Sequence, residues 1–458
     1  MKTDPSSTHI HYLVRAILLA FTAVAISLAF WSIARAPAIL ARADNPRRVE
    51  AELRIQRGRI YDRHDTLLAE SQRTNGFFTR LYALPTAGPA VGYYSFRYGT
   101  AGVEEGYDAY LRGESSDPWQ AQSRELLHQP QIGGDLRLTL DATLQAQADS
   151  LLGDQTGALL LLQLGDGGSD PAQILALASH PGYDANDLDK AFETLAADKQ
   201  APLLNRATQG QYQPGLVTQP FILAVALEQG IIDLNEPVAH TNRPVMVNGV
   251  ATYCATPPPD PSTWADVLYH RCPGPMLDLV ERVDQADVAA ALSAFGLTER
   301  PQLPLNTETA VSTPISSTTL ALIGQDTLVV TPLQVAVAWA GLAGDGRLPA
   351  LQIVSDIQDE NGNWLAEPPA EPTRETAVPS EIARRLRQTL PTGPTGASFS
   401  VLVLSGPDGS TNAWYLGLAP AANPAYAVVV VLENSSDLTA VEQIGQEMLT
   451  AVVQEMLP

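Results

Sequence analysis

The sequence predicts a protein of the α+β class. Apolar runs typical of strands occur in two parts of the chain, at residues 157–163 with 174–178 and at residues 413–419 with 425–432. The long sequence between these pairs has helical and loop patterns, and such segregation is typical of α+β folds. The 458 residues, 45% hydrophobic and 17% charged, are enough for two or three domains with a sizeable core.

Individual elements follow from local patterns. Residues 157–163 and 174–178 are too apolar for edge strands, so we expect them to be neighbours inside one sheet. Residues 136–141 alternate as a strand, and Asp141 is suited to cap a helix that continues through residues 144–148. Residues 441–456 predict a terminal helix, and residues 51–56 predict a short strand from their alternation.

The N-terminal region predicts one transmembrane helix. Residues 16–33 carry no charge, and with their flanks they reach the roughly 20 residues that cross a bilayer. We place the helix at residues 12–34, after a cytoplasmic tail of residues 1–11. The alternative is a cleaved signal peptide, because Ala34-Arg35-Ala36 has the small-x-small form, although Pro37 would follow the cut. The arginines on both sides leave the orientation undecided by charge.

The charge balance excludes one class of partner. Asp and Glu number 50 against 28 Lys and Arg, so the formal net charge is −22. Such a surface repels polyanions, and we therefore expect no nucleic-acid binding. No Cys/His cluster has zinc spacing and no phosphate-binding Gly-Lys-Ser/Thr loop occurs, so we expect neither a metal nor a cofactor.

The two cysteines, Cys254 and Cys272, can form a single disulfide if this part of the chain lies outside the cytoplasm. Closing that loop would stabilise the fold by about 3 kcal/mol on the chain-entropy model. Two separate thiols are the alternative.

A signature follows the membrane segment. Arg57-Gly-Arg-Ile-Tyr-Asp-Arg63 with Leu67-Leu-Ala69 resembles the Arg-Gly-x-Ile-x-Asp-Arg segment that opens the external part of class B penicillin-binding proteins, with Asp65 where that family has glycine. Gly102, Glu104, Tyr107, Asp108 and Gly113 continue the resemblance. It implies an N-terminal stalk or dimerisation-type module at residues 35–132. Gly133-Gly134 marks a turn, and we place the domain boundary there.

Residues 133–458 resemble the penicillin-binding transpeptidase domain. The matching landmarks run in order along the chain: Leu138-Thr-Leu-Asp141, Pro181 with Tyr183 and Asp184, Asn205-Arg-Ala207, Thr331-Pro-Leu-Gln334, Ala413-Trp-Tyr415 and Glu433-Asn434. The resemblance implies a serine β-lactamase-like fold, an antiparallel sheet with a helical subdomain.

The resemblance also marks three catalytic motifs, and all three are altered. The family's Ser-x-x-Lys supplies a nucleophile and a base, but Leu216 and Gln219 stand at these positions. The family's Ser-x-Asn relays protons, whereas this chain has Arg271-Cys272-Pro273. The Lys-Thr-Gly strand holds a substrate carboxylate, but here Pro407, Asp408 and Gly409 occupy it. No catalytic residue is therefore predicted.

The sequence therefore predicts the transpeptidase fold without the family's catalytic side chains. No Ser or Thr lies three residues before a lysine, and Ser405 and Ser410 are better explained by turn chemistry. The resemblance implies a pseudoenzyme that acts in bacterial cell-wall assembly as a scaffold or regulator, with a polytopic peptidoglycan glycosyltransferase as its partner. It further implies a single-pass membrane location with the C-terminal body outside the cytoplasm. The alternatives are an active but divergent D,D-transpeptidase and a non-covalent binder of peptidoglycan peptides.

Overall fold

The computed structural model describes residues 5–35, 50, 52–114, 131–165, 170–308, 314–371, 376–406 and 408–455. The chain forms two compact units. The first comprises residues 1–55 and 73–79, and the second comprises residues 56–72 and 80–458. Pro407, at one of the predicted motif positions, lies outside the described residues.

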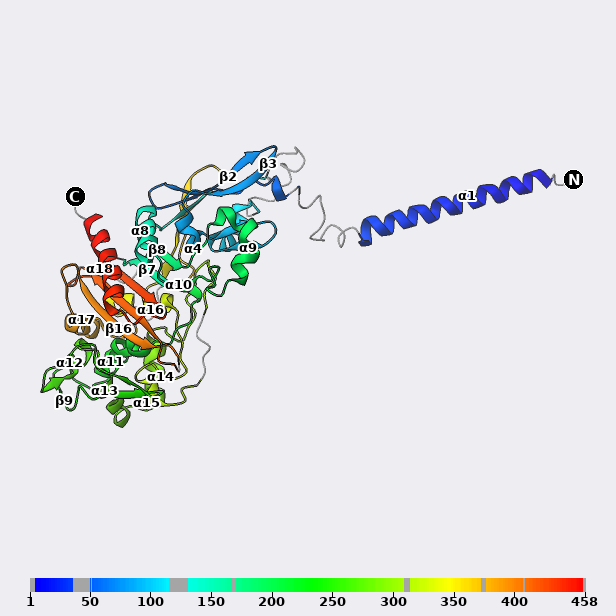
Figure 1. The fold of residues 1–458 in the computed structure, drawn as a ribbon. Helices are drawn as coiled ribbons and strands as arrows, with labels where there is room; N and C mark the ends of the chain where they lie inside the picture. Colours follow the sequence, from blue (N-terminus) through cyan, green and yellow to red (C-terminus); the bar gives the residue numbers. More distant parts are fainter. Residues whose placement is uncertain are drawn as a thin grey trace. The chain divides into compact units, whose positions relative to one another are not determined.

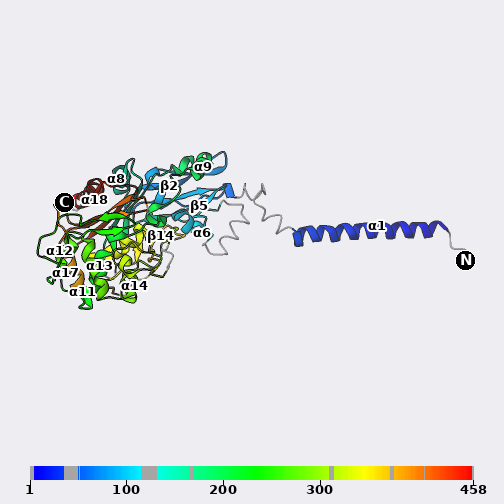
Figure 2. The ribbon, with the colours of Figure 1, turned by 60° about the horizontal axis from the view of Figure 1, so that its bottom comes forward.

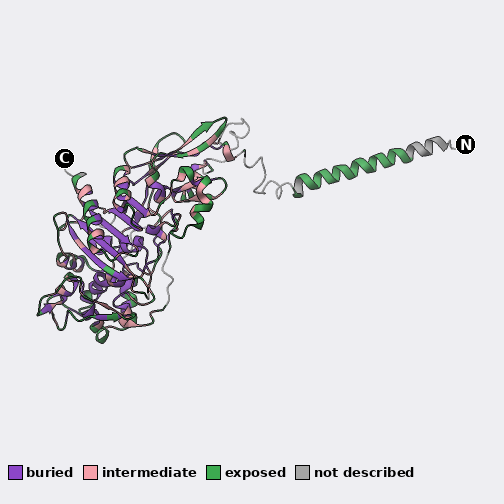
Figure 3. Ribbon diagram, viewed as in Figure 1, coloured by how far each residue is buried: buried purple, intermediate pink, exposed green. Residues whose placement is uncertain are grey.

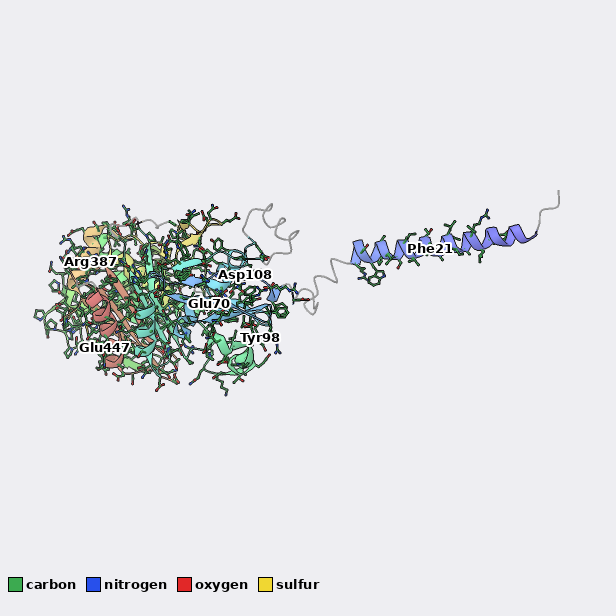
Figure 4. All side chains as sticks on the ribbon, turned by 90° about the horizontal axis from the view of Figure 1, so that it is seen from above. Phe21, Glu70, Tyr98, Asp108, Arg387 and Glu447 are labelled. Carbon is green, nitrogen blue, oxygen red and sulfur yellow. A yellow bond between two sulfur atoms is a disulfide. The ribbon has the colours of Figure 1, made fainter. Side chains whose placement is uncertain are left out.

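The first unit contains a long apolar helix. Helix α1 spans Pro5–Ala29 and continues as the π-helix η1 over Phe30–Arg35. Within it, Tyr12–Ser32 has a mean hydropathy of 2.3 and no buried residues (Figure 3). Phe21 projects from α1 with 71% of its surface exposed (Figure 4). Among the described residues this helix alone is long and apolar enough to span a membrane.

The second unit is built on a six-stranded sheet with the order β13-β8-β7-β18-β17-β16. All neighbours are antiparallel except β13 and β8. The strands are β7 (Gly157–Gln163), β8 (Ala172–His180), β13 (Leu351–Gln352), β16 (Ala397–Leu404), β17 (Thr411–Ala419) and β18 (Tyr426–Leu432). The four strands expected from apolar runs are thus all present, and none of them lies at an edge.

Helices cover both faces of this sheet (Figure 1). On one face, α8 (Ala142–Leu152) and α18 (Leu438–Glu455) pack against β7, β8, β17 and β18. Asp141 caps α8 by accepting from the N–H groups of Thr143 and Leu144, as predicted. On the other face lies α16 (Pro332–Ala343), a helix with every residue buried. An all-round apolar helix is expected where protein surrounds it.

A second six-stranded sheet has the order β15-β14-β6-β1-β2-β3. Its strands are β1 (Ile60–Tyr61), β2 (Leu67–Thr74), β3 (Phe77–Tyr82), β6 (Leu136–Leu138), β14 (Val354–Gln358) and β15 (Trp364–Ala366). The sheet combines strands from both sides of the Gly133-Gly134 turn. The strand predicted at residues 51–56 is wrong, because Glu52 and Leu53 are helical. A period-two pattern over six residues is too short to exclude a helical turn.

Small helices and strands complete the second unit. Its helices, besides those above, are α4 (Gly88–Val91), α5 (Val103–Gly106), α6 (Asp108–Leu111), α9 (Leu188–Ala197), α10 (Arg206–Gln209), α11 (Gln219–Glu228), α12 (Trp264–Tyr269), α13 (Pro273–Asp278), α14 (Gln285–Ala294), α15 (Thr318–Ala321) and α17 (Ser380–Thr389). Its two-stranded sheets are β4 (Tyr93–Ser95) with β5 (Gly99–Ala101), β9 (Pro237–Val238) with β12 (Ser262–Thr263), and β10 (Val245–Val247) with β11 (Val250–Thr252). Helices α11 to α14 gather at one end of the unit (Figure 2).

Candidate functional site

The first motif segment lies at the centre of the second unit. Gly215 begins a 3-10 turn, η4 (Gly215–Thr218), which leads directly into α11. Gly215 has a φ of +51°, and a Cβ there would lie 2.6 Å from a methyl carbon of Val403 on β16. Only glycine meets both demands. The segment that the resemblance aligns with the family's nucleophile is therefore fixed against the sheet.

The side chains of this segment are apolar or already bonded. Leu216 is partly buried and packs against the main hydrophobic core. Thr218, the only hydroxyl nearby in the sequence, is fully buried and donates to the Gly215 carbonyl at 3.0 Å. Leu216 has no heteroatom, and the Thr218 hydroxyl is bonded to the Gly215 carbonyl, which is not a base, so neither side chain is an activated nucleophile.

Gln219 connects the first motif position to the second. Its side chain is fully buried, and Nε2 donates to the Cys272 carbonyl at 3.1 Å. The Oε1 atom has no hydrogen-bond partner among the described residues. A carboxamide does not accept a proton near neutral pH, so Gln219 serves as a structural link and not as a base.

The second motif position follows α12, a helix whose start is fixed by a capping box between Thr263 and Asp266. Arg271 has a left-handed backbone with φ +52°. Its Nη1 donates to the Tyr269 carbonyl at 2.9 Å, and burial lowers its pKa, which Glu442 only partly opposes. Pro273 is buried as the first residue of α13 and has no N–H to donate.

A disulfide fastens this loop to the β10–β11 hairpin. Cys272 is fully buried and is bonded to the partly buried Cys254, which follows the hairpin. The Ala255 N–H also donates to the His270 carbonyl at 2.9 Å. The structure thus has the disulfide and not two separate thiols.

The third motif position is a turn and not a strand. The Ser405 N–H donates to the Ser410 carbonyl at 2.8 Å, which closes a short loop between β16 and β17. Asp408 is exposed, and a hydrogen bond from Ser410 lowers the pKa of its carboxyl. Gly409 has a φ of +83°, and a Cβ there would lie 3.4 Å from Val250 of β11. Ser405 and Ser410 are accordingly turn residues.

Three histidines of the described chain, His64, His180 and His270, each have a separate partner. Nε2 of His180 lies 2.7 Å from a carboxylate oxygen of Asp149, and Nε2 of His64 lies 3.0 Å from Asp141. Nδ1 of His270 lies 2.7 Å from the hydroxyl of Thr256 at the exposed surface. In the part of the chain that the structure describes, no three His, Cys, Asp or Glu side chains are arranged to hold a metal ion.

The flanks of the first motif are held by a partly buried ion pair. Nε of Arg206 lies 2.9 Å from the Glu433 carboxylate, which also accepts from the Tyr212 hydroxyl at 2.7 Å. Burial and the Glu433 charge raise the pKa of Tyr212, which stays a neutral donor. These contacts join landmarks that are far apart in the sequence, Asn205-Arg-Ala207 and Glu433-Asn434.

The stalk signature has an equally specific structural role. Arg57 donates from Nη2 to the Glu104 carboxylate at 2.8 Å and from Nη1 to Asp108 at 2.6 Å. Nε of Arg80 lies 2.5 Å from the other Glu104 oxygen, and the Glu104 side chain is fully buried. Burial alone would lower the pKa of Arg57. The Glu104 and Asp108 carboxylates outweigh this effect, so the pKa of Arg57 is raised. Arg80 belongs to no motif, so its part in this network could not be predicted from the sequence.

Asp65 explains a departure from the stalk signature. It has a φ of +63°, the conformation in which glycine is favoured and aspartate is among the tolerated residues. Its carboxylate pairs with Arg137 at 2.7 Å. The substitution therefore keeps the turn and adds an ion pair at the surface.

Comparison with known proteins identifies the family of this chain. The family model described as the penicillin binding protein transpeptidase domain matches residues 170–454. The chain belongs to this family. The model described as the penicillin binding protein A dimerisation domain matches residues 57–136, the region of the Arg57–Glu104 network.

The relatives of this penicillin-binding protein cover almost its whole length. It is 28% identical over 442 residues to peptidoglycan D,D-transpeptidase PbpA of Mycolicibacterium smegmatis, covering 86% of this chain and 88% of that one. The protein of the same name from Mycobacterium tuberculosis is 27% identical over 439 residues, with the same coverage. These relatives place the protein among the penicillin-binding transpeptidases of peptidoglycan synthesis.

Solved structures agree with the fold. Penicillin-binding protein A from M. tuberculosis, in an imipenem acyl-enzyme complex, has a TM-score of 0.77 at 25% identity, covering 88% of this chain and 99% of that one. A D,D-transpeptidase domain from Eggerthella lenta has a TM-score of 0.73 at 21% identity, covering 88% of this chain and 100% of that one, which supports the fold. The predicted α+β transpeptidase fold behind a stalk module is thus confirmed.

Proposed function

We propose that this penicillin-binding protein is a pseudoenzyme, a membrane-anchored scaffold or regulator of peptidoglycan synthesis without transpeptidase activity of its own. The observation that carries the proposal is the pair Leu216 and Gln219. Leu216 packs against the hydrophobic core, and Nε2 of Gln219 donates a hydrogen bond to the Cys272 carbonyl. A nucleophile and its base are both missing where acyl transfer requires them.

The other two motif positions support the same reading. The relay position holds Arg271 and a proline without an N–H. The position of the carboxylate anchor includes the exposed carboxylate of Asp408, which would repel a substrate carboxylate. One replacement could be offset by a neighbouring residue, but four functions are lost together.

The competing function is an active but divergent D,D-transpeptidase. Its support is that the relatives are named D,D-transpeptidases and that the M. tuberculosis protein forms acyl-enzyme complexes with imipenem and with penicillin G. Against it stands the absence of a hydroxyl on Leu216. Covalent labelling by a penicillin separates the two functions, since only an activated nucleophile forms the adduct.

The membrane anchor is part of the proposed role. Tyr12 and Trp31 stand near the two ends of the apolar segment of α1. Nineteen residues apart on a helix they are about 28 Å distant, close to the roughly 30 Å of hydrocarbon in a bilayer. Aromatic residues favour both interfaces of a membrane. We propose a single-pass anchor of a bacterial cell membrane with the body outside the cytoplasm.

The proposed partner is a polytopic peptidoglycan glycosyltransferase. The proposal rests on two elements that transpeptidation itself does not need. These are the apolar helix and the stalk with its Arg57–Glu104 network, and this chain has both. Detergent co-purification of the tagged full chain, with the M. tuberculosis relative as a matched bait, tests it. We expect a cell-wall polymerase in the complex. Recovery of no cell-wall synthesis protein across several mild detergents would contradict the scaffold role.

A further inference from the structure

Strand β3 is an open edge of the second sheet. In the described part of the chain it pairs with β2 alone, through a hairpin whose two turn residues, Asn75 and Gly76, both have positive φ (Figure 1). Phe77 and Leu81 of this strand are 38% and 37% exposed, and Thr79 between them is exposed as well. An edge strand with exposed apolar side chains is a template for pairing with another chain.

Hydrogen bonds at the end of β3 show which way its backbone groups point. The Ala83 N–H donates to the Leu68 carbonyl of β2 at 2.8 Å. The Tyr82 N–H donates instead to Oδ1 of Asn186 at 2.9 Å, and Nδ2 of Asn186 donates to the Tyr82 carbonyl at 3.0 Å. The backbone groups of Tyr82 therefore face away from β2, and the Asn186 side chain satisfies them as a further strand would.

The other outward backbone groups of β3 belong to Phe78 and Arg80. Successive residues of an antiparallel strand bond to opposite sides, so these two residues point the same way as Tyr82. The only charge in β3 is that of Arg80, which is turned inward, with Nε 2.5 Å from the Glu104 carboxylate and the side chain 2% exposed. The strand therefore has neither the exposed lysine nor the proline that commonly protects an edge.

We propose that β3 pairs antiparallel with β3 of a second copy of this chain, about a two-fold axis that passes beside Thr79. In this register Phe78 of each copy lies opposite Arg80 of the other, so their outward N–H and C=O groups bond one another. On the exposed side Phe77 of each copy faces Leu81 of the other, and Thr79 faces itself. This order of exposed residues is symmetric about Thr79, as a two-fold contact requires.

The charge of the hairpin also favours a second copy. The chain has a net charge of −22, so two copies repel each other over most of their surface. Residues 71–82 contain no Asp or Glu, although the chain has 50 of them. Two copies can therefore meet along β3 with no carboxylate on either strand. The pairing uses no residue of the altered motifs, so it holds or fails independently of the pseudoenzyme proposal.

Charge exchange at the axis tests the proposal. We expect the full chain in detergent to form a dimer whose fraction rises with protein concentration, as measured by analytical ultracentrifugation. Thr79→Lys and Thr79→Asp each place like charges opposite each other and should weaken the dimer at least about 10-fold. An equimolar mixture of the two variants should restore it, because opposite charges then face each other across the axis. A folding defect would give no such recovery.

Thr74→Lys and Thr74→Asp are the matched controls, since Thr74 is exposed on β2 of the same hairpin, away from the proposed axis. Alone or mixed, these variants should dimerise as the wild type does. The proposal is overturned if the wild type stays monomeric at every concentration or if Thr79→Lys leaves its dimer unchanged. It is also overturned if the mixture of Thr79→Lys and Thr79→Asp associates no better than either variant alone.

Discussion

At the scale of single residues, the proposed loss of transpeptidase chemistry rests on Leu216 and Gln219. Leu216 is partly buried and packs against the core, and Gln219 donates from its amide to the Cys272 carbonyl. The identity of both residues was visible in the sequence. Their new structural roles were not, because a hydrogen bond over 53 positions leaves no local pattern.

Restoring the first motif alone should not restore activity. In Leu216→Ser/Gln219→Lys we expect no covalent adduct with a fluorescent penicillin, because Arg271, Pro273 and Asp408 still lack the relay and the anchor. The measurement is gel fluorescence after incubation, with the M. tuberculosis relative as positive control. A labelled band from a variant with an unchanged melting curve would show that the first motif is the only deficiency.

The buried carboxylate of Glu104 should be the most sensitive position of the stalk. Glu104→Gln removes the charge that pairs two arginines, and breaking such a buried network costs about 3–5 kcal/mol. Denaturant unfolding of the full chain measures it. Glu228→Gln, at an exposed position of α11, is the control and should change stability little. A loss below about 1 kcal/mol would refute the structural role of the network.

His180 makes stability depend on pH. The hydrogen bond that Nε2 of His180 donates to the Asp149 carboxylate raises the pKa of His180 above its ordinary 6.5. The protonated form is favoured in the folded state, so its contribution is fully present below pH 6.5 and is lost as the pH rises through the higher folded pKa. We expect His180→Gln to remove this decline in melting temperature. Parallel pH profiles of the two proteins would rule the mechanism out.

At the scale of elements, the strands of the main sheet were predictable and the third motif was not. The runs at residues 157–163 and 425–432 are buried on both faces, so nearly every residue is apolar. Near Asp408 the resemblance predicts a strand, but the chain turns between Ser405 and Ser410. Proline, aspartate and glycine favour such a turn, and this local preference outweighed the family pattern.

The disulfide is the second element that the sequence left open. Cys254→Ser/Cys272→Ser should lower the free energy of unfolding by about 3 kcal/mol, the value expected for a loop of this length. The measurement compares unfolding of both proteins with and without a reductant. Reductant should destabilise the wild type alone. Equal stability of the two proteins under oxidising conditions would contradict the role of the bond in fastening the β10–β11 hairpin.

For the whole molecule, family landmarks predicted the fold because they are the contacts that hold it together. Two ion pairs join distant segments, a buried one between Arg57 and Glu104 and a partly buried one between Arg206 and Glu433. The composition of the second sheet could not be predicted, since the short strands β6 and β14 come from distant parts of the chain and pair Leu138 with Val354. Long-range pairing of short strands has no local signal.

The proposed function also concerns the whole molecule. We propose a protein that works by binding, because an apolar helix and an ordered stalk are present while Leu216 and Gln219 stand where the resemblance places the nucleophile and its base. Its relatives bear the name D,D-transpeptidase, so the account depends on whether this chain can be acylated.

Intact-mass spectrometry of the full chain after prolonged incubation with penicillin G tests this most directly. The account predicts an unchanged mass, while the M. tuberculosis relative, treated in parallel, gains one penicillin per chain. A stoichiometric mass increase in this protein, located on any serine or threonine by peptide mapping, would contradict the central claim that it is a pseudoenzyme.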